Sequence, residues 1–133
     1  MIVDTSAVIA VLFQEPEAQR FSDLIGQTMD CRISAANYFE AAIVLDGSRN
    51  PIVSRRLDEF ILRAEVVIEP VTAVQARIAR EAYQYFGKGS GHPAQLNFGD
   101  CFSYALAVET DQPLLFKGND FSQTDVRSAL ADL

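Results

Sequence analysis

The chain has 133 residues, of which 49% are hydrophobic and 22% charged, and its 11 basic and 18 acidic side chains give a formal net charge of −7. This length predicts a single domain over residues 1–133, and a mean hydropathy of +0.07 excludes a disordered or low-complexity chain. No apolar run approaches the roughly 18 residues of a membrane span, and the first residues, MIVD, have neither the basic start nor the cleavage site of a signal peptide.

The two cysteines, Cys31 and Cys101, both lie inside apolar segments. Two cysteines are too few for a disulfide framework, and these two show none of the Cys or His spacings of a zinc site. We therefore expect them to be small core side chains of a reduced, cytoplasmic protein.

The first half of the chain alternates between β-favouring runs and helix-compatible segments. In chain order we expect a strand at 1–4, helices at 6–13 and 16–25, a strand at 31–34, and helices at 35–45 and 51–63. Gly26 is expected to end the second helix. Pro51 suits the first position of the fourth helix, because its missing N–H would have no partner there.

The second half continues the alternation. In chain order we expect a strand at 65–70, a helix from the N-cap Thr72 to Phe86, a glycine-rich loop at 87–98, a helix at 99–109 and a strand at 112–116. Strands and helices that alternate in this way predict an α/β fold, with a central parallel sheet flanked by helices on both faces. We take the 65–70 strand to lie in the centre of that sheet.

Four acidic residues occupy positions that are unusual for surface side chains. Asp4 ends the first strand, Asp120 follows the last strand, and Asp100 begins the helix after the glycine-rich loop. Glu40 interrupts an apolar helix, and no lysine or arginine lies three or four residues away from it. Ligands of parallel α/β sheets bind outside the carboxyl ends of the strands, so a site is expected there.

Taken alone, each acid has a simpler interpretation. Asp4 and Asp100 could cap helices, Asp120 could belong to an ordinary turn, and Glu40 could lie on an exposed helix face. Taken together, four carboxylates without a histidine favour Mg²⁺ or Mn²⁺ over zinc. Such a cation suits phosphodiester cleavage, and it would let an acidic protein accept a phosphate.

Four segments in this order resemble PIN-domain ribonucleases and, more narrowly, the VapC toxins of VapBC toxin–antitoxin systems. They are the N-terminal MIVDTSA, the isolated Glu40, GDCFSYALA from Gly99, and PLLFKGNDF from Pro113. The resemblance covers essentially the whole chain. It departs at Asn119, where related sequences often carry a second aspartate.

The resemblance implies a PIN-like fold and a Mg²⁺- or Mn²⁺-dependent endoribonuclease that cuts by in-line attack of an activated water, leaving 5′-phosphate and 3′-hydroxyl ends. It also implies a toxin that is inhibited by a cognate VapB-type antitoxin and usually forms a homodimer. The family's acids fall on Asp4, Glu40, Asp100 and Asp120, with Asp4 and Asp100 as the more direct metal ligands. Candidate substrate-binding residues are Thr5, Ser6, Lys88 and Asn119. Of these, Thr5 or Ser6 is expected to hydrogen-bond either Asp4 or the scissile phosphate, and Lys88 is a candidate from its place in the glycine-rich loop, where it could meet an RNA phosphate.

Two other functions stay open from the residues. One is a binding module that works through a partner alone. The other is a receiver-type phosphoacceptor domain, which needs an aspartate at the end of a central strand, whereas the 65–70 strand ends in Pro70. Ser6 excludes an Asp-x-Asp phosphatase, and the GKGSG of residues 87–91 lacks the spacing and position of a phosphate-binding P-loop.

Several residues near these segments are expected to have structural roles only. Tyr83, Tyr85 and Phe86, at the end of a helix, are expected in the core or in a dimer contact rather than against RNA bases. Ser103, one turn after Asp100, could touch the site, but we expect it to be an ordinary small helix residue.

Overall fold

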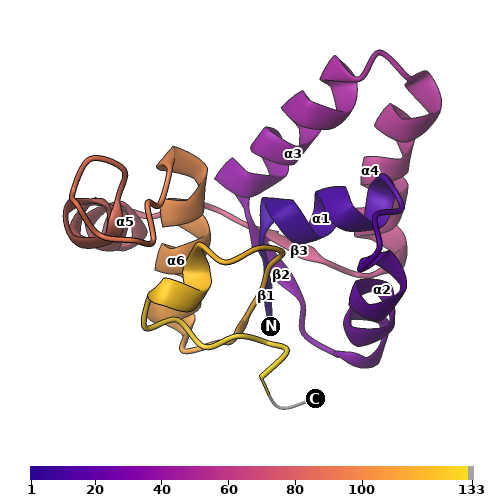
Figure 1. The fold of residues 1–133 in the computed structure, drawn as a ribbon. Helices are drawn as coiled ribbons and strands as arrows, with labels where there is room; N and C mark the ends of the chain where they lie inside the picture. Colours follow the sequence, from indigo (N-terminus) through magenta and orange to yellow (C-terminus); the bar gives the residue numbers. More distant parts are fainter. Residues whose placement is uncertain (132–133) are drawn as a thin grey trace.

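A computed structural model describes residues 1–131, so residues 132–133 of the predicted domain lie outside the described residues. Its centre is a parallel four-stranded sheet in the order β3-β2-β1-β4 (Figure 1). The strands are β1 (Ile2–Val3), β2 (Arg32–Ser34), β3 (Val67–Glu69) and β4 (Leu114–Leu115). The helices are α1 (Thr5–Leu12), α2 (Ala18–Gln27), α3 (Ala35–Gly47), α4 (Pro51–Arg63), α5 (Ala73–Phe86), α6 (Phe98–Thr110) and the 3-10 helix η1 (Phe121–Gln123).

The sheet separates two hydrophobic cores, as a sheet covered on both faces requires. Val3 and Leu115 belong to the core shared with α1 to α4, whereas Ile2 and Leu114 belong to the core shared with α5 and α6. Successive strand side chains point to opposite faces, so β1 and β4 each contribute one side chain to each core. Figure 1 shows α5 and α6 on one side of the sheet and α1 to α4 on the other, which confirms the predicted α/β architecture.

Both cysteines are core residues, as expected. Cys31 lies in the core of α1 to α4 and Cys101 in the core of α5 and α6, and both thiols are free. Within residues 1–131, the helices are all too short or too polar to cross a membrane.

The helix starts that were predicted from capping residues are confirmed. Pro51 is the first residue of α4, and the side chain of Asn50 accepts a hydrogen bond from the N–H of Ile52. Thr72 caps α5 by accepting from the N–H of Gln75 at 3.1 Å. The expected end of α2 is wrong by two residues, because the helix runs to Gln27 and Gly26 stays in it rather than adopting the positive φ of a helix-terminating glycine.

The expectation that the third strand lies in the centre of the sheet is wrong. β3 is an edge strand, and Val67 and Ile68 are 49% and 40% exposed. It is also shorter than the predicted run, because Glu65 has a φ of 53° and lies in the turn that closes α4. The central strands are β1 and β2, so Asp4 follows a central strand, and the argument used above against a receiver domain fails.

Candidate functional site

The four acids predicted from the sequence come together in one pocket of about 320 Å³. Asp4 follows β1, Glu40 lies in α3, Asp100 lies in the first turn of α6, and Asp120 directly precedes η1. The other residues that line this acid pocket are Thr5, Ser6, Val44, Asn97, Lys117 and Phe121. Acids that are up to 116 residues apart in the chain thus share one concave site.

Asp4 is buried, and hydroxyl groups hold both oxygens of its carboxylate. Oδ2 accepts from the backbone N–H of Ser6 at 3.0 Å and from its hydroxyl at 2.6 Å, which makes Asp4 the N-cap of α1. Oδ1 accepts from the hydroxyl of Ser103 at 2.5 Å. Ser6 Oγ in turn accepts from the N–H of Lys117 at 2.9 Å, which connects the end of β4 to the same cluster. Asp4 therefore caps α1, as its simpler interpretation predicted, and it also lines the acid pocket.

Asn37 joins three elements beneath the pocket. Its side chain is fully buried, and its amino group donates to the hydroxyl of Thr5 at 3.2 Å and to the carbonyl of Gly99 at 2.9 Å. The hydroxyl of Thr5 donates to the carbonyl of Asn37 at 3.2 Å. These bonds fix α1 and the start of α6 against α3, and so set the relative positions of the segments that carry the acids.

Asp100 combines a structural role with a perturbed charge. Its carboxylate accepts from the N–H of Asn97 at 3.0 Å, and Asn97 accepts from the N–H of Asp100 at 2.8 Å, so the two form a capping box at the start of α6. Burial, together with the nearby charges of Asp4, Asp120 and Glu40, raises the pKa of Asp100 to about 7, although the bond from Asn97 acts in the opposite direction. A cation in the pocket would relieve this repulsion.

Glu40 is half-buried, and its carboxylate lies directly over Gly99. A β-carbon built on Gly99 would come within 2.1 Å of Glu40 Oε2, so only glycine leaves room for this carboxylate. The glycine that precedes Asp100 thus places a second acid at the mouth of the pocket. The simpler interpretation placed Glu40 on an exposed helix face. That face is exposed at Ile43 and Val44, but Glu40 itself lines the pocket.

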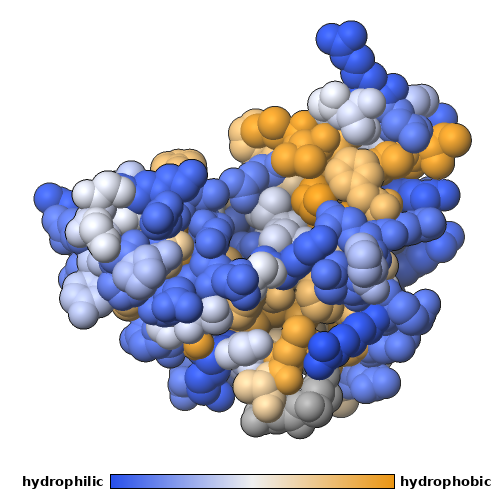
Figure 2. All heavy atoms as spheres, in the orientation of Figure 1, coloured by the Kyte–Doolittle hydropathy of each residue, from blue (hydrophilic) through white to orange (hydrophobic). Residues whose placement is uncertain are grey.

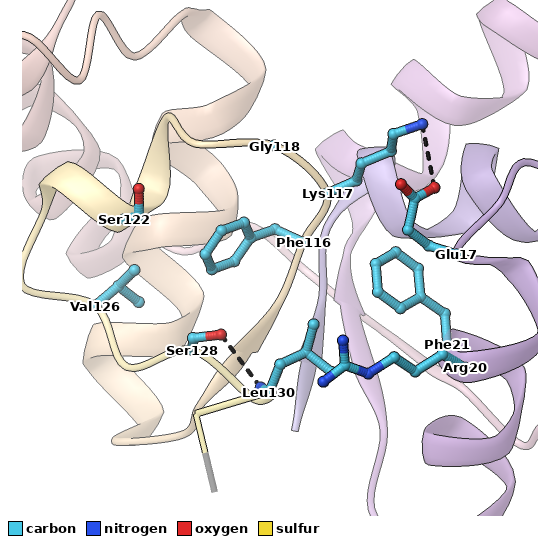
Figure 3. A pocket seen from close by; sticks show the side chains of 10 residues that line it. All are labelled: Glu17, Arg20, Phe21, Phe116, Lys117, Gly118, Ser122, Val126, Ser128 and Leu130. Atoms are coloured by element: carbon cyan, nitrogen blue, oxygen red, sulfur yellow. Dashed lines mark hydrogen bonds and ion pairs between the residues drawn. The ribbon is translucent and has the colours of Figure 1, made fainter. Parts of the chain in front are cut away.

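Lys117 lines the pocket, but other acids bind its ammonium group. Lys117 Nζ pairs with Glu15 and, at 3.2 Å, with Glu17 (Figure 3). Figure 3 shows the Lys117 side chain extending toward Glu17, on the side of a neighbouring cavity. Among residues 1–131, no lysine, arginine or histidine forms an ion pair with any of the four acids of the pocket.

The donor atoms suit a hard cation, although they are not yet arranged around one. In the part of the chain described, no three His, Cys, Asp or Glu side chains form a group that could hold a metal ion as they stand. Asp4 and Asp100 are held by their hydrogen bonds, whereas the carboxylates of Glu40 and Asp120 accept none from residues 1–131. An all-oxygen set with two fixed and two adjustable carboxylates fits Mg²⁺ or Mn²⁺, which bind through few carboxylates and several waters.

Some predicted residues lie elsewhere, and two residues of the site were missed. Lys88 and Asn119 do not line the acid pocket, and Lys88 uses its backbone N–H to bond the carbonyl of Leu96. Ser103 was expected to have no special role, yet it binds Asp4. Asn37 was not predicted to belong to the site, and a buried amide within an apolar helix is the signal that could have identified it.

Comparisons with known proteins agree with this geometry. The family model described as PIN domain matches residues 1–127. Ribonuclease VapC28 of Mycobacterium tuberculosis is 58% identical over 130 residues, covering 98% of each chain, and ribonuclease VapC42 of the same species is 45% identical over 129 residues, covering 97% of this chain and 98% of the relative. The crystal structure of M. tuberculosis VapC20 superimposes with a TM-score of 0.73 over 94% of this chain and 95% of that one, at 17% identity. The chain therefore belongs to the PIN-domain family, within its VapC branch.

Proposed function

We propose that this chain is a metal-dependent endoribonuclease that acts as the toxin of a type II toxin–antitoxin pair. The observation that carries the proposal is the acid pocket, where four carboxylates from separate segments meet without a basic partner among residues 1–131. The relatives with the same fold are named ribonucleases, and VapC20 is described as a toxin that cleaves the sarcin–ricin loop. The PIN-domain match also removes the receiver-domain alternative, which the central position of β1 had reopened.

The residues of the pocket have distinct roles in this proposal. Bound Mg²⁺ or Mn²⁺ would activate a water and neutralise the scissile phosphate. Asp4 and Asp100 would be its principal ligands, and Glu40 and Asp120 would complete the set directly or through water. Ser103 orients the Asp4 carboxylate, as residues behind a metal ligand commonly do.

Two of the candidate substrate-binding residues line the acid pocket, but their hydroxyls already bond within the protein. Ser6 donates to Asp4, and Thr5 donates to the carbonyl of Asn37. Their role in the proposal is therefore to position the acids, and RNA contact would come through groups at the pocket rim.

The proposal is tested by incubating total RNA with purified, antitoxin-free protein in Mg²⁺, in Mn²⁺ and in EDTA. We expect discrete fragments that require metal, and a loss of cleavage in Asp4→Asn of about 100-fold or more, because loss of a residue that only supports a metal ligand already costs about 10–100-fold. Asp23→Asn, a change on the outer surface of α2, serves as the matched control and should cleave at the parent rate. Intact RNA under every condition would contradict the proposal and favour a binding module instead.

Gly99→Ala should disable the pocket without unfolding the protein. The added methyl group would occupy the position of the Glu40 carboxylate, which must swing away from Asp100. We expect cleavage to fall about 10-fold or more, while thermal unfolding changes little, because a carboxylate at the end of a flexible side chain can move. Gly26→Ala, where a β-carbon meets nothing within 4 Å, is the matched control and should leave cleavage unchanged. Parent-level cleavage by Gly99→Ala would show that the position of Glu40 does not matter.

The partners in this proposal follow from the surface next to the pocket. Phe39, Ile43 and Val44 of α3 are exposed, and the apolar patch they form beside the pocket is visible over α3 in Figure 2. An antitoxin of VapB type would cover apolar surface here and place a basic segment against the acids. We also propose that the chain forms a homodimer, as the resemblance implies.

A further inference from the structure

A second pocket, of about 370 Å³, lies between α5 and α6 and has no role in the account above. The residues that line this α5–α6 groove are Ala76, Ala79, Arg80, Tyr83, Phe98, Cys101 and Phe102. All of them except Arg80 contribute mainly apolar or aromatic surface. Pockets of this size and character are typical of sites for small, flat organic groups.

The groove adjoins the acid pocket along a single turn of helix. Asn97 and Asp100 line the acid pocket, while Phe98, Cys101 and Phe102 line the groove. Consecutive helical residues are rotated by about 100°, so these two sets occupy neighbouring faces at the start of α6. A strand held at the acid pocket would therefore bring an adjacent nucleotide to the groove.

The groove presents an aromatic side chain that is unusually open to solvent. Phe98 is 77% exposed, although it is one of the largest apolar residues of the chain. Phe102 supports it from one side, in an edge-on contact with ring centroids 4.9 Å apart. Tyr83 is an exposed residue of the groove wall, so the expectation that it lies in the core is wrong, while a dimer contact stays a prediction. Exposed, supported aromatic rings are the means by which proteins stack unpaired bases.

Arg80 gives the groove a positive charge at its edge. Its guanidinium is exposed and forms no hydrogen bond or ion pair within residues 1–131, in a chain with a net charge of −7. An uncompensated arginine beside an aromatic wall is complementary to a nucleotide, which carries one phosphate and one flat base.

We propose that the α5–α6 groove binds an unpaired base of the RNA strand next to the scissile phosphate, stacked on Phe98, with Arg80 on the neighbouring phosphate. This inference rests on the proposed function, because it assigns the groove to the same RNA. It makes Phe98 and Arg80 positioning residues that select single-stranded over paired RNA, since a paired base cannot enter the groove.

The chain contains no tryptophan, so Phe98→Trp would introduce a single fluorescent probe at the proposed stacking position. The experiment combines Phe98→Trp with Asp100→Asn, which prevents cleavage, and titrates a fluorescein-labelled single-stranded RNA of 12 nucleotides and mixed sequence. As RNA is added, we expect the Trp emission to be quenched to saturation over the same concentration range in which the anisotropy of the RNA label changes. Leu62→Trp in the same background is the matched control, because Leu62 is 79% exposed but lies in α4, and its emission should not change. RNA binding without quenching at position 98 would overturn the inference.

Substitutions of Phe98 and Arg80 separate stacking from other roles. Phe98→Ala should weaken RNA binding by about 10-fold, Phe98→Tyr should retain it, and Phe98→Leu should not restore it, because leucine is apolar but cannot stack. Arg80→Gln should reduce the slope of log affinity against log salt by about 0.7, the value for one phosphate contact on a single strand. The folding of Phe98→Ala is checked by thermal unfolding, which an exposed side chain should change little.

The outcomes also distinguish the inference from the proposed function. If the parent chain cleaves RNA with metal and Phe98→Ala binds and cleaves RNA as well as the parent does, the inference is overturned. The proposed nuclease function would then still stand. If Phe98→Ala turns a dimer into a monomer without changing RNA affinity, the groove binds a second copy of the chain. That result would also overturn the inference. No metal-dependent cleavage by the parent chain would remove the proposed function, and the inference with it.

Discussion

Replacing Asp100 with asparagine is expected to abolish RNA cleavage and, in the absence of divalent cations, to make the protein more stable at neutral pH. Cleavage is lost because the amide is a poor ligand for a hard cation. The capping box survives, because the side-chain carbonyl of asparagine can still accept from the N–H of Asn97. The variant therefore removes the charge of Asp100 and little else.

The pH dependence of this gain follows from the raised pKa of Asp100. The pKa is about 7 in the folded protein, mainly because of burial, and about 3.9 in an unfolded chain. Between these values the folded state holds a proton that the unfolded state has lost, so the stability of the parent falls as pH rises from about 4 to 7. With allowance for the partial exposure of Asp100, we expect the variant to be more stable by about 2 kcal/mol at pH 8 and by almost nothing at pH 4.

Urea unfolding in EDTA at a series of pH values measures this difference. Asp23→Asn, on the surface of α2, is the control and should follow the parent at every pH. Adding Mg²⁺ or Mn²⁺ should stabilise the parent but not Asp100→Asn, because a ligand that binds only the folded state raises its stability. A variant no more stable than the parent at pH 8, or equal effects of metal on both, would contradict the role assigned to Asp100.

The helices were predictable because their ends depend on residues close in sequence. Asn50 and Thr72 bond N–H groups two and three residues away, so the pattern of capping residues was sufficient. Strand order depends on contacts between distant segments. The apolar run VVI in residues 66–68 is typical of a buried strand, yet only Val66 is buried, and Val67 and Ile68 lie exposed in the edge strand of the sheet. Nothing within the run itself could indicate that no further strand covers it.

The acids of the site were predictable for a related reason. Asp4 and Asp120 follow strands, and the carboxyl ends of parallel strands gather on one edge, so their convergence follows from topology. The residues that hold the acids in place were not predictable in this way. Ser103 binds Asp4 across 99 residues and Asn37 binds Gly99 across 62, so the neighbouring sequence identifies neither partner, although an amide within an apolar helix marks Asn37 as unusual.

Asn37→Ala should be the most destabilising of the small polar substitutions around the pocket. The variant would remove the bond from Asn37 to the carbonyl of Gly99, which keeps only its helical partner within α6, and one of the two hydrogen bonds that link Asn37 with Thr5. A buried hydrogen bond contributes about 0.5–1.5 kcal/mol, and the variant removes two of them together with the packing of a buried side chain. The Oδ1 atom of Asn37 has no partner in residues 1–131, so its removal offsets part of this cost. We expect a net loss of about 2 kcal/mol in the free energy of unfolding.

The matched control is Asn50→Ala, which removes the exposed N-cap of α4 and should cost only about 1 kcal/mol. Urea unfolding compares the two variants, and an unchanged m-value would show that only the stability of the folded state differs. At a temperature where both variants are folded, Asn37→Ala should also cleave RNA more slowly, because α1 and α6 lose the link that sets Asp4 against Asp100, whereas Asn50→Ala should cleave like the parent. Equal losses of stability in both variants, with equal cleavage, would show that the acids keep their positions without Asn37.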